Sequence, residues 1–207
     1  MIILAHRGWW DRAEEKNSSQ AFARALHAGY GIETDIRDSM GQLVISHDPP
    51  TSTGLMTFND FAQLYREAAS DAPLALNIKA DGLQAGVLDC LTAHGITNYF
   101  VFDMAVPDAL GYLSRGTPTY TRQSKYEPIP SFYEDAIGVW VDCFDGELCP
   151  NDAIADHLNA GKNVALVSPE LHRKPHEAAW RQWKSLPGDD MMLCTDFPDR
   201  ADKFFNG

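Results

Sequence analysis

The first 48 residues of the chain hold two histidine clusters on either side of a pair of carboxylates. His6 and Arg7 follow one short apolar run, and His47 follows another. Between them, Glu33 and Asp35 lie two residues apart, so both side chains point to one face of an extended chain. Adjacent carboxylates repel each other, and a cation between them removes the repulsion. Two histidines, two carboxylates and an arginine at strand ends indicate a site that cleaves a phosphate ester.

Each of these clusters alone has a simpler explanation. A single histidine after a strand is usually structural, a lone pair of acidic residues is usually a solvated strand edge, and an Arg-Gly step is usually a turn. Here three such clusters fall at three strand ends within the first quarter of the chain. Their combination favours a functional site over three coincidences.

The composition limits the class of protein. The chain has 207 residues, 44% of them hydrophobic, which is enough for the core of one domain spanning residues 1–207. Its net charge of −12, with only 17 lysines and arginines, argues against binding to nucleic acid or to anionic lipid. A small-molecule phosphodiester is the partner that suits the residues described above. Nothing in the sequence indicates an oligomeric state.

The N-terminus and the cysteines bear on the compartment. The first residues lack a basic segment followed by a long apolar one, so we expect no signal peptide, and no apolar run approaches the roughly 20 residues of a membrane span. The four cysteines are scattered without a Cys-x-x-Cys pair, which favours reduced thiols over a disulfide framework. Together these features predict a cytoplasmic protein.

Short apolar runs with strand character alternate with helical patterns along the chain. We expect eight strands, at residues 2–5, 31–35, 74–78, 99–102, 118–120, 139–141, 163–167 and 191–194. Helical patterns cover residues 18–28, 58–69, 83–93, 106–113, 152–159, 175–186 and 198–205. Eight such units without a linker predict an α/β protein, a compact (β/α)8 TIM barrel in a single domain. A doubly wound sheet is the alternative.

Three local features refine this arrangement. Residues 122–132 contain two prolines, so we expect a loop there, with at most one helical turn after it. The sequence around Gly41 is typical of a hairpin turn that leads into a further short strand. Asn17 or Ser18 should cap the first helix, and Asn151 should cap the helix predicted at residues 152–159.

A barrel of this kind places catalytic groups at the carboxyl ends of its strands. Seven acidic or basic residues fall at such ends: His6, Glu33, Asp35, Lys79, Asp103, Asp142 and Asp196. A doubly wound sheet would leave fewer of these ends facing a common cavity. The polar strand ends therefore support both the barrel and the site.

This pattern resembles the glycerophosphodiester phosphodiesterase family, whose barrel is similar to that of phosphatidylinositol phospholipase C. Matching residues occur in the family's order and at similar spacing: His6-Arg7-Gly8, Asn17-Ser18, Glu33-Thr34-Asp35, Gly41, His47-Asp48 and, near the end, Thr195-Asp196-Phe197-Pro198. The resemblance is specific over residues 2–50, fair at 74–81 and 191–199, and faint between. It implies the barrel fold, a divalent metal and cleavage of glycerophosphodiesters in lipid metabolism.

Two positions depart from the family's motifs. The family's Glu-x-Lys after the third strand is here Asn77-Ile78-Lys79, so a neutral amide replaces a carboxylate. The Glu of its Pro-Glu-Asn-Thr motif is Lys16. Both changes remove negative charge, so we expect weaker metal binding than at a site with three carboxylates.

The residue types suggest individual roles in the site. Glu33 and Asp35 are hard oxygen ligands for one divalent cation, Mg²⁺ or Ca²⁺, and Asn77 can add a carbonyl oxygen. His6 and His47 are the candidates for general acid and general base, because histidine titrates near working pH. These residue types do not decide which of the two histidines accepts the proton.

Other polar residues have roles around this centre. Arg7 offers a fork that matches two phosphate oxygens, and Lys79 can reach a further one. Asp103 is either a third carboxylate ligand or a helix cap. Asp48 is expected either to orient a neighbouring histidine or to cap the Pro49-Pro50 turn.

The remaining acidic and histidine residues are given less specific roles. A second acidic cluster, Asp142, Asp145 and Glu147, suggests loop polarity or recognition of hydroxyl groups. Solvated structural roles are expected for the histidines in or beside the helices, which are His27, His94, His157, His172 and His176.

These observations predict a metal-dependent phosphodiesterase that hydrolyses small glycerophosphodiesters to an alcohol and glycerol phosphate by histidine acid–base catalysis. Two alternatives stay open. Asn77 and Lys16 would suit a non-catalytic or weakly active barrel that binds phosphate esters. A lyase that releases a cyclic phosphate would use the same site with a different outcome.

Overall fold

The strands form from the short apolar runs, whose side chains are buried on both sides of the sheet. The computed structural model describes residues 1–51, 54–144, 149–186 and 191–207. Within these residues the strands are β1 Ile2–His6, β2 Gly31–Ser39, β3 Gln42–Ile45, β4 Leu74–Ile78, β5 Tyr99–Phe102, β6 Tyr120–Gln123, β7 Gly138–Val141, β8 Asn163–Val167 and β9 Met191–Thr195. All of them except β3 pair in parallel.

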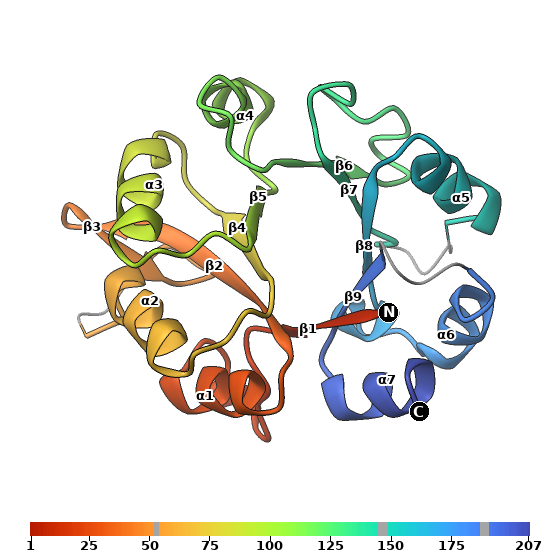
Figure 1. Cartoon of the computed structure of the whole chain (residues 1–207), viewed down its shortest axis with the longest axis horizontal. Coiled ribbons are helices and arrows are strands. Elements are labelled where there is room, and N and C mark those ends of the chain that lie inside the picture. Colours follow the sequence, from red (N-terminus) through yellow and green to blue (C-terminus); the bar gives the residue numbers. More distant parts are fainter. Residues whose placement is uncertain (52–53, 145–148, 187–190) are drawn as a thin grey trace.

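The parallel strands follow one another around a barrel. Their order is β5-β4-β2-β1-β9-β8-β7-β6, and β5 meets β6 at the seam. There Val101 bridges Thr119, and the Val101 N–H donates to the carbonyl of Pro118 at 2.9 Å. In Figure 1 the helices lie in an outer ring around these strands. The compact single-domain (β/α)8 TIM barrel predicted from the sequence is confirmed.

Helices connect most consecutive strands on the outside of the barrel, and a last helix follows the final strand. They are α1 Ser19–His27, α2 Phe58–Glu67, α3 Gln84–Ala93, α4 Val106–Leu113, α5 Asn151–Asn159, α6 Glu177–Trp183 and α7 Pro198–Phe205, with 3-10 turns η1 Ala13–Glu15 and η2 Pro169–His172. Ser18 caps α1, as predicted, because its hydroxyl accepts from the Ala21 N–H at 3.2 Å. The predicted cap at Asn151 is wrong: Pro150 precedes α5, and Asn151 donates to the carbonyl of Gln182 at 3.0 Å.

Large aromatic rings fill the interior of the barrel. Phe100 stacks on Tyr120 with ring centroids 3.7 Å apart, and Phe102 stacks on Trp140 at 3.9 Å. Gly138 makes room for Tyr120, since a Cβ on this glycine would lie 2.5 Å from the tyrosine ring. These rings close the barrel beneath the polar residues that follow on the same strands.

The fifth unit differs from the others, as expected. Its strand, β6, covers residues 120–123 rather than the predicted 118–120, because Pro118 lacks the N–H that a continuous ladder needs. No helix lies between β6 and β7, whose connecting residues are all described. A tight turn joins Ser124 to Glu127, and a helical turn follows in which the Ala136 N–H donates to the carbonyl of Phe132 at 3.1 Å. The predicted two-proline loop is present, but it begins at residue 124 rather than 122, because Arg122 and Gln123 belong to β6.

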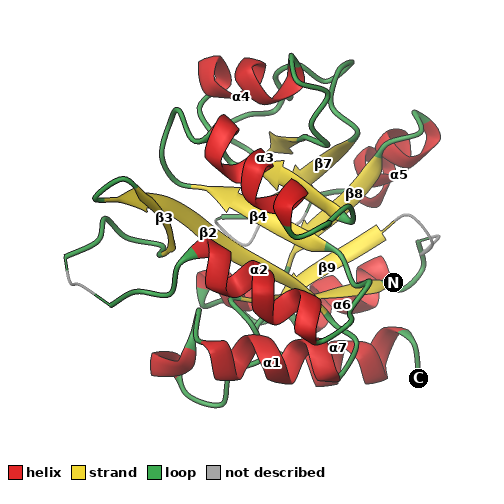
Figure 2. Ribbon diagram, turned by 60° about the vertical axis from the view of Figure 1, so that its left-hand side comes forward, coloured by secondary structure: helices red, strands yellow, loops and turns green. Residues whose placement is uncertain are grey.

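The predicted hairpin follows β2. Met40 and Gly41 have φ values of 50° and 80°, as a two-residue turn between antiparallel strands requires, and β3 pairs with β2 beyond them. Figure 2 shows the ends of β2 and β3 extending away from the barrel. Within the described part of the chain, no helix is long and apolar enough to cross a membrane. Cys90, Cys143, Cys149 and Cys194 are free thiols.

Candidate active site

The carboxyl ends of the strands surround a cavity of about 340 Å³. The sequence predicted seven residues for catalysis, phosphate binding or metal binding. Six of them line the cavity: His6, Arg7, Glu33, His47, Asn77 and Lys79. The seventh, Asp35, is buried beside it with 1% of its surface exposed, and its Oδ2 lies 3.0 Å from Arg7 Nε. The structure therefore brings all seven predicted residues to one place.

β2 carries both carboxylates because its inward-facing side chains lie two residues apart. Pairing of β2 with β1 and β4 places His6 opposite Glu33, and Asn77 opposite Asp35. Burial, together with the negative charge of Asp35, raises the pKa of Glu33 to about 8. A positive charge at this point would favour the ionised form of Glu33.

Three buried oxygens in this group have no hydrogen-bond partner in the described residues: Glu33 Oε2, Asp35 Oδ1 and Asn77 Oδ1. Buried polar atoms are normally paired, so three unpaired acceptors together require an explanation. Asn77 Nδ2 donates to Glu33 Oε1 at 3.3 Å, which leaves the amide oxygen to act as an acceptor. Two carboxylate oxygens and one amide oxygen fit a hard divalent cation such as Mg²⁺ or Ca²⁺.

A conventional metal cluster is not part of this arrangement. In the described part of the chain, no three His, Cys, Asp or Glu side chains are grouped so that they could hold a metal ion. The third oxygen donor is an amide, as the Asn77-Ile78-Lys79 sequence implies. A site with two carboxylates attracts a cation less strongly than a site with three.

Basic side chains balance the carboxylates on the far side of β4. Lys79 Nζ lies 3.0 Å from Asp103 Oδ2 and 3.8 Å from Asp35 Oδ1, and Arg122 also pairs with Asp103. The sequence suggested Asp103 as a metal ligand or a helix cap. The cap is wrong, because α4 begins after Ala105 without a side-chain hydrogen bond. Asp103 instead forms ion pairs with the side chains of Lys79 and Arg122 at the cavity wall. The sequence had suggested no role for Arg122.

His6 is held by a carboxylate from the opposite end of the chain. Its Nδ1 lies 2.6 Å from Asp196 Oδ1, and its Nε2 faces Glu33 Oε2 at 3.9 Å. Burial lowers the pKa of His6, although the hydrogen bond to Asp196 opposes this shift. Because Nδ1 is engaged, Nε2 is the atom that can exchange a proton in the cavity.

Asp196 is itself positioned by a residue that sequence reasoning missed. The carboxylate of Glu170 accepts hydrogen bonds from the hydroxyls of Ser168 and Thr195, and from the Asp196 N–H at 3.2 Å. These bonds tie η2 to the end of β9. No motif in the sequence signals Glu170, because Thr195 and Asp196, which it joins to η2, come from a different part of the chain.

His47 reaches the cavity from the end of β3 and is more accessible than His6. Its side chain is 45% exposed, compared with 12% for His6. Its Nδ1 lies 2.8 Å from Asp48 Oδ1, and Arg37 Nε donates to its carbonyl at 3.0 Å. Asp48 is therefore placed to orient His47, which is one of the two roles that the sequence suggested.

The loop before α1 supports the carboxylates of β2. Asn17 Nδ2 donates to Asp35 Oδ2 at 3.1 Å, and its Oδ1 accepts from the Thr34 hydroxyl at 2.9 Å. Its φ of 59° is a left-handed conformation that asparagine tolerates better than most residues. Asn17 was expected to cap the helix, but it fixes the position of Asp35.

The opposite wall of the cavity comes from β7, β8 and the segments that follow them. It is lined by Trp140, Asp142, Phe144, Val167, Leu171 and His172. His172 Nε2 lies 2.6 Å from Asp142 Oδ1, and this hydrogen bond raises the pKa of His172. The sequence assigned His172 a solvated structural role, whereas the structure places it in the cavity wall. Asp145 and Glu147, grouped with Asp142 in the sequence, lie outside the described residues.

Solved structures share this arrangement of strands and helices. A glycerophosphodiester phosphodiesterase from Agrobacterium tumefaciens superposes with a TM-score of 0.75 and 18% identity over 100% of both chains. A phosphodiesterase of Oleispira antarctica, in complex with the product sn-glycerol-3-phosphate, gives 0.73 and 16% over 100% of this chain and 97% of its own. A Ca²⁺-dependent phosphatidylinositol-specific phospholipase C from Streptomyces antibioticus gives 0.54 and 12%, over 99% and 95%. The chain has the fold of these phosphodiesterases. No protein-family model and no curated protein matches it.

The two residues that depart from the family's motifs, Asn77 and Lys16, lie at different places in this phosphodiesterase-type barrel. Asn77 lies beside the carboxylates of β2, where its amide replaces a charge. Lys16 lies beside the His6–Asp196 pair, with its Nζ 3.7 Å from Asp196 Oδ2. The lysine therefore adds its positive charge beside His6 and Asp196, and the asparagine is the change that bears directly on the oxygen cluster.

Proposed function

We propose that the chain is a metal-dependent phosphodiesterase that hydrolyses small glycerophosphodiesters to an alcohol and glycerol phosphate. The observation that carries this proposal is the group of unpaired oxygens on Glu33, Asp35 and Asn77 beside the His6–Asp196 pair. The shared fold with the Agrobacterium enzyme, and the glycerol phosphate bound by the Oleispira enzyme, support the substrate class. The Ca²⁺ dependence of the Streptomyces enzyme supports the metal.

The first task of such a site is to offset negative charge. A phosphodiester resists attack because its oxygens are negative and become more so in the transition state. Arg7 and Lys79 line the cavity and present positive charge to a bound phosphate. A divalent cation held by the three oxygens would supply further stabilisation of the phosphate charge.

The second task is proton transfer, which we assign to the two histidines. The lowered pKa of His6 keeps its ring neutral near neutral pH, so Nε2 can accept a proton from the attacking water as its oxygen bonds to phosphorus. His47 also lines the cavity, and we assign to it the donation of a proton to the alcohol oxygen as the P–O bond breaks. The products are the alcohol and glycerol phosphate, and exchange with solvent resets both rings.

The direct test is to incubate the protein with glycerophosphodiesters and Mg²⁺ or Ca²⁺, and to follow the phosphorus species by ³¹P NMR. We expect glycerol phosphate to form and turnover to stop in chelator. A cyclic phosphate as the end product would establish the lyase instead. Binding without turnover would establish a phosphate-ester-binding barrel, and full turnover in chelator would contradict the role of the metal.

A further inference from the structure

One wall of the active-site cavity carries a charged pair that the proposed chemistry does not use. Asp142 follows β7, and His172 ends η2, 30 residues later. Their 2.6 Å contact joins Asp142 Oδ1 to His172 Nε2. The side chains are 10% and 24% exposed, and both line the same cavity as His6, Glu33 and Lys79. The pair is therefore within reach of a substrate bound there.

The pair keeps one polar atom on each residue for a ligand. Asp142 Oδ2 and His172 Nδ1 make no hydrogen bond to another described residue, and neither is a buried unpaired atom. Asp142 Oδ2 can only accept a hydrogen bond. His172 Nδ1 donates when the ring is protonated and accepts when it is neutral. A hydroxyl group suits these two atoms whether the His172 ring is protonated or neutral, because it can both donate and accept a hydrogen bond.

The surroundings favour an alcohol with carbon-bound hydroxyls over a bare ion. Phe144 lies against His172 with ring centroids 5.1 Å apart, and Leu171 and Trp140 line the cavity beside them. Apolar surfaces next to two adjacent polar atoms match a carbon chain that carries neighbouring hydroxyls. A quaternary ammonium has no hydrogen to donate to Asp142, and its charge would be repelled by the protonated form of His172.

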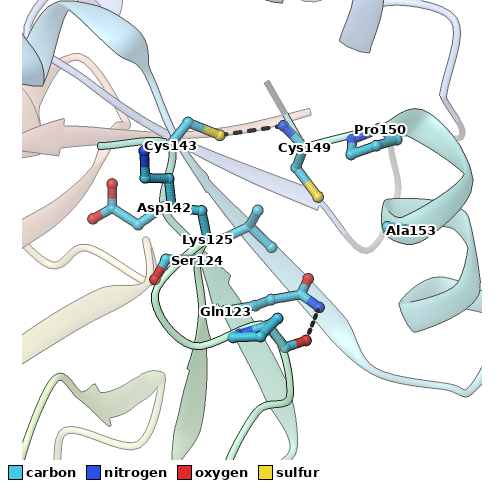
Figure 3. Close-up of a pocket in the computed structure, with 10 residues that line it drawn as sticks. Gln123, Ser124, Lys125, Asp142, Cys143, Cys149, Pro150 and Ala153 are labelled. Atoms are coloured by element: carbon cyan, nitrogen blue, oxygen red, sulfur yellow. Dashed lines mark hydrogen bonds between the residues drawn. The ribbon is translucent and has the colours of Figure 1, made fainter. Parts of the chain in front are cut away.

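A second cavity gives this wall additional space. It has a volume of about 250 Å³, and Asp142 lines both cavities. Figure 3 shows that the Asp142 carboxylate points away from the thiols of Cys143 and Cys149, which also line this pocket. Asp142 thus stands at the boundary between the phosphate site and the space beyond it.

We propose that Asp142 and His172 form the subsite for the leaving alcohol, and that this alcohol carries vicinal hydroxyls. The inference rests on the proposed function and names its substrate class. Asp142 Oδ2 accepts from one hydroxyl, and His172 Nδ1 bonds to its neighbour. The phosphate lies toward His6 and Arg7, and the hydroxylated end of the alcohol lies against β7 and η2.

The test uses two diesters of glycerol phosphate that differ only in the leaving alcohol, glycerol or 1-propanol. For the wild type we expect kcat/KM to favour the glycerol ester by on the order of 10- to 100-fold, because a site with polar groups discriminates against a substrate that leaves them unpaired. His172→Ala and Asp142→Asn should each bring this ratio down toward one. His94→Ala is the matched control, because His94 bonds to Asn59 outside the cavity, and it should keep the wild-type ratio.

The outcomes separate this inference from the proposed function. If the wild type cleaves both esters equally, or if each variant lowers both rates by the same factor, the pair is structural and the inference is overturned. A preference for glycerophosphocholine that Asp142→Asn abolishes would make the pair a cation site, which also overturns it. If the wild type cleaves no diester, the proposed function fails and the subsite falls with it. Melting temperatures of the variants show whether they fold.

Discussion

The two walls of the cavity contain similar kinds of residue in different states. On the wall of β1, β2 and β4, Glu33 and Asp35 are 2% and 1% exposed, and oxygens of both are unpaired. On the wall of β7 and β8, Asp142 is paired with His172, and both are partly exposed. A buried oxygen without a hydrogen-bond partner is costly, so it is tolerated where a ligand supplies that partner. The comparison indicates reaction chemistry on the first wall and recognition on the second.

The packing behind the two walls supports both halves of the barrel. Behind the first wall, Phe22 meets Phe61 edge to face with ring centroids 4.7 Å apart. Behind the second, Trp180 and Trp183 are buried in a separate apolar cluster, and the Trp180 indole donates to the Ser168 hydroxyl at 2.8 Å. Both walls therefore have rigid support, and the difference between them lies in charge and burial.

The largest expected effect comes from matched carboxylate-to-amide changes on the two walls. Asp35→Asn or Glu33→Gln should abolish metal retention and cleavage of every diester, because each removes a charged ligand. Asp142→Asn should leave cleavage measurable and change only which alcohol is preferred. Steady-state rates on several diesters, with bound metal measured by mass spectrometry, check this. Equal losses at Asp35 and Asp142 would remove the distinction between the walls.

Histidine substitutions should show the next largest difference. His6→Ala and His47→Ala should each lower kcat by on the order of 10²–10⁴, since each removes a proton-transfer group. The loss for His172→Ala should depend on the leaving alcohol, and its melting temperature serves as a folding control. A loss of less than about tenfold for His6 or His47 would exclude that residue from a catalytic role.

The first wall could be predicted from the sequence, whereas of the pair on the second wall only Asp142 was placed at a strand end and His172 was missed. Glu33 and Asp35 lie two residues apart on β2, between a strand that ends in His6 and a strand that carries Asn77 as its last residue but one, so alternation and register alone bring them together. The second wall depends on a pair whose members are 30 residues apart, one of them in a 3-10 turn without a periodic signal.

Long-range partners explain the other differences between sequence and structure. Asp196 and His6 lie 190 residues apart, and only closure of the barrel makes them neighbours. Asp103 ended as an ion-pair partner because Arg122, on the next strand, reaches it. β6 begins two residues later than predicted, because Pro118 has no N–H to donate to a neighbouring strand. The local pattern located the strands, whereas the contacts between side chains at their ends depend on the closed barrel.

The buried carboxylate of the first wall should also give the metal-free protein a characteristic pH dependence. Glu33 has a folded pKa raised to about 8 from 4.5, so between these values the folded state binds more protons than the unfolded state. The free energy of unfolding should therefore fall by a few kcal/mol as pH rises through this window. Glu33→Gln should flatten the decline. Urea titrations at pH 5 and pH 8 in chelator measure it.

The histidine-bound carboxylate should behave in the opposite way. Burial alone would raise the pKa of Asp196, but the hydrogen bond and the charge of His6 hold it below its ordinary value. Its contribution to stability is present above the unfolded pKa of 3.8 and is lost as pH falls through the folded one.

The outcome that would contradict the Glu33 prediction is also defined. If Glu33→Gln leaves the dependence of the free energy of unfolding on pH between pH 5 and pH 8 unchanged, Glu33 is not the source of the decline.

The smallest expected effect comes from restoring the charge at Asn77. Asn77→Glu should tighten metal binding and raise activity at limiting metal, because a third carboxylate increases the attraction for a divalent cation. At saturating metal the two proteins should differ little. Asp103→Asn is a suitable comparison, since Asp103 pairs with Lys79 and Arg122 and should not change metal affinity in the same direction. Unchanged affinity in Asn77→Glu would mean that residue 77 does not contact the ion.

The central claim is that the unpaired oxygens of Glu33, Asp35 and Asn77 hold one divalent cation. Isothermal titration of Mg²⁺ or Ca²⁺ into the metal-free wild type and into Glu33→Gln tests it without reference to any substrate. The account predicts saturable binding of one ion per chain in the wild type and loss of that binding in the variant. Equal binding by both proteins, or none by the wild type at millimolar metal, would contradict it.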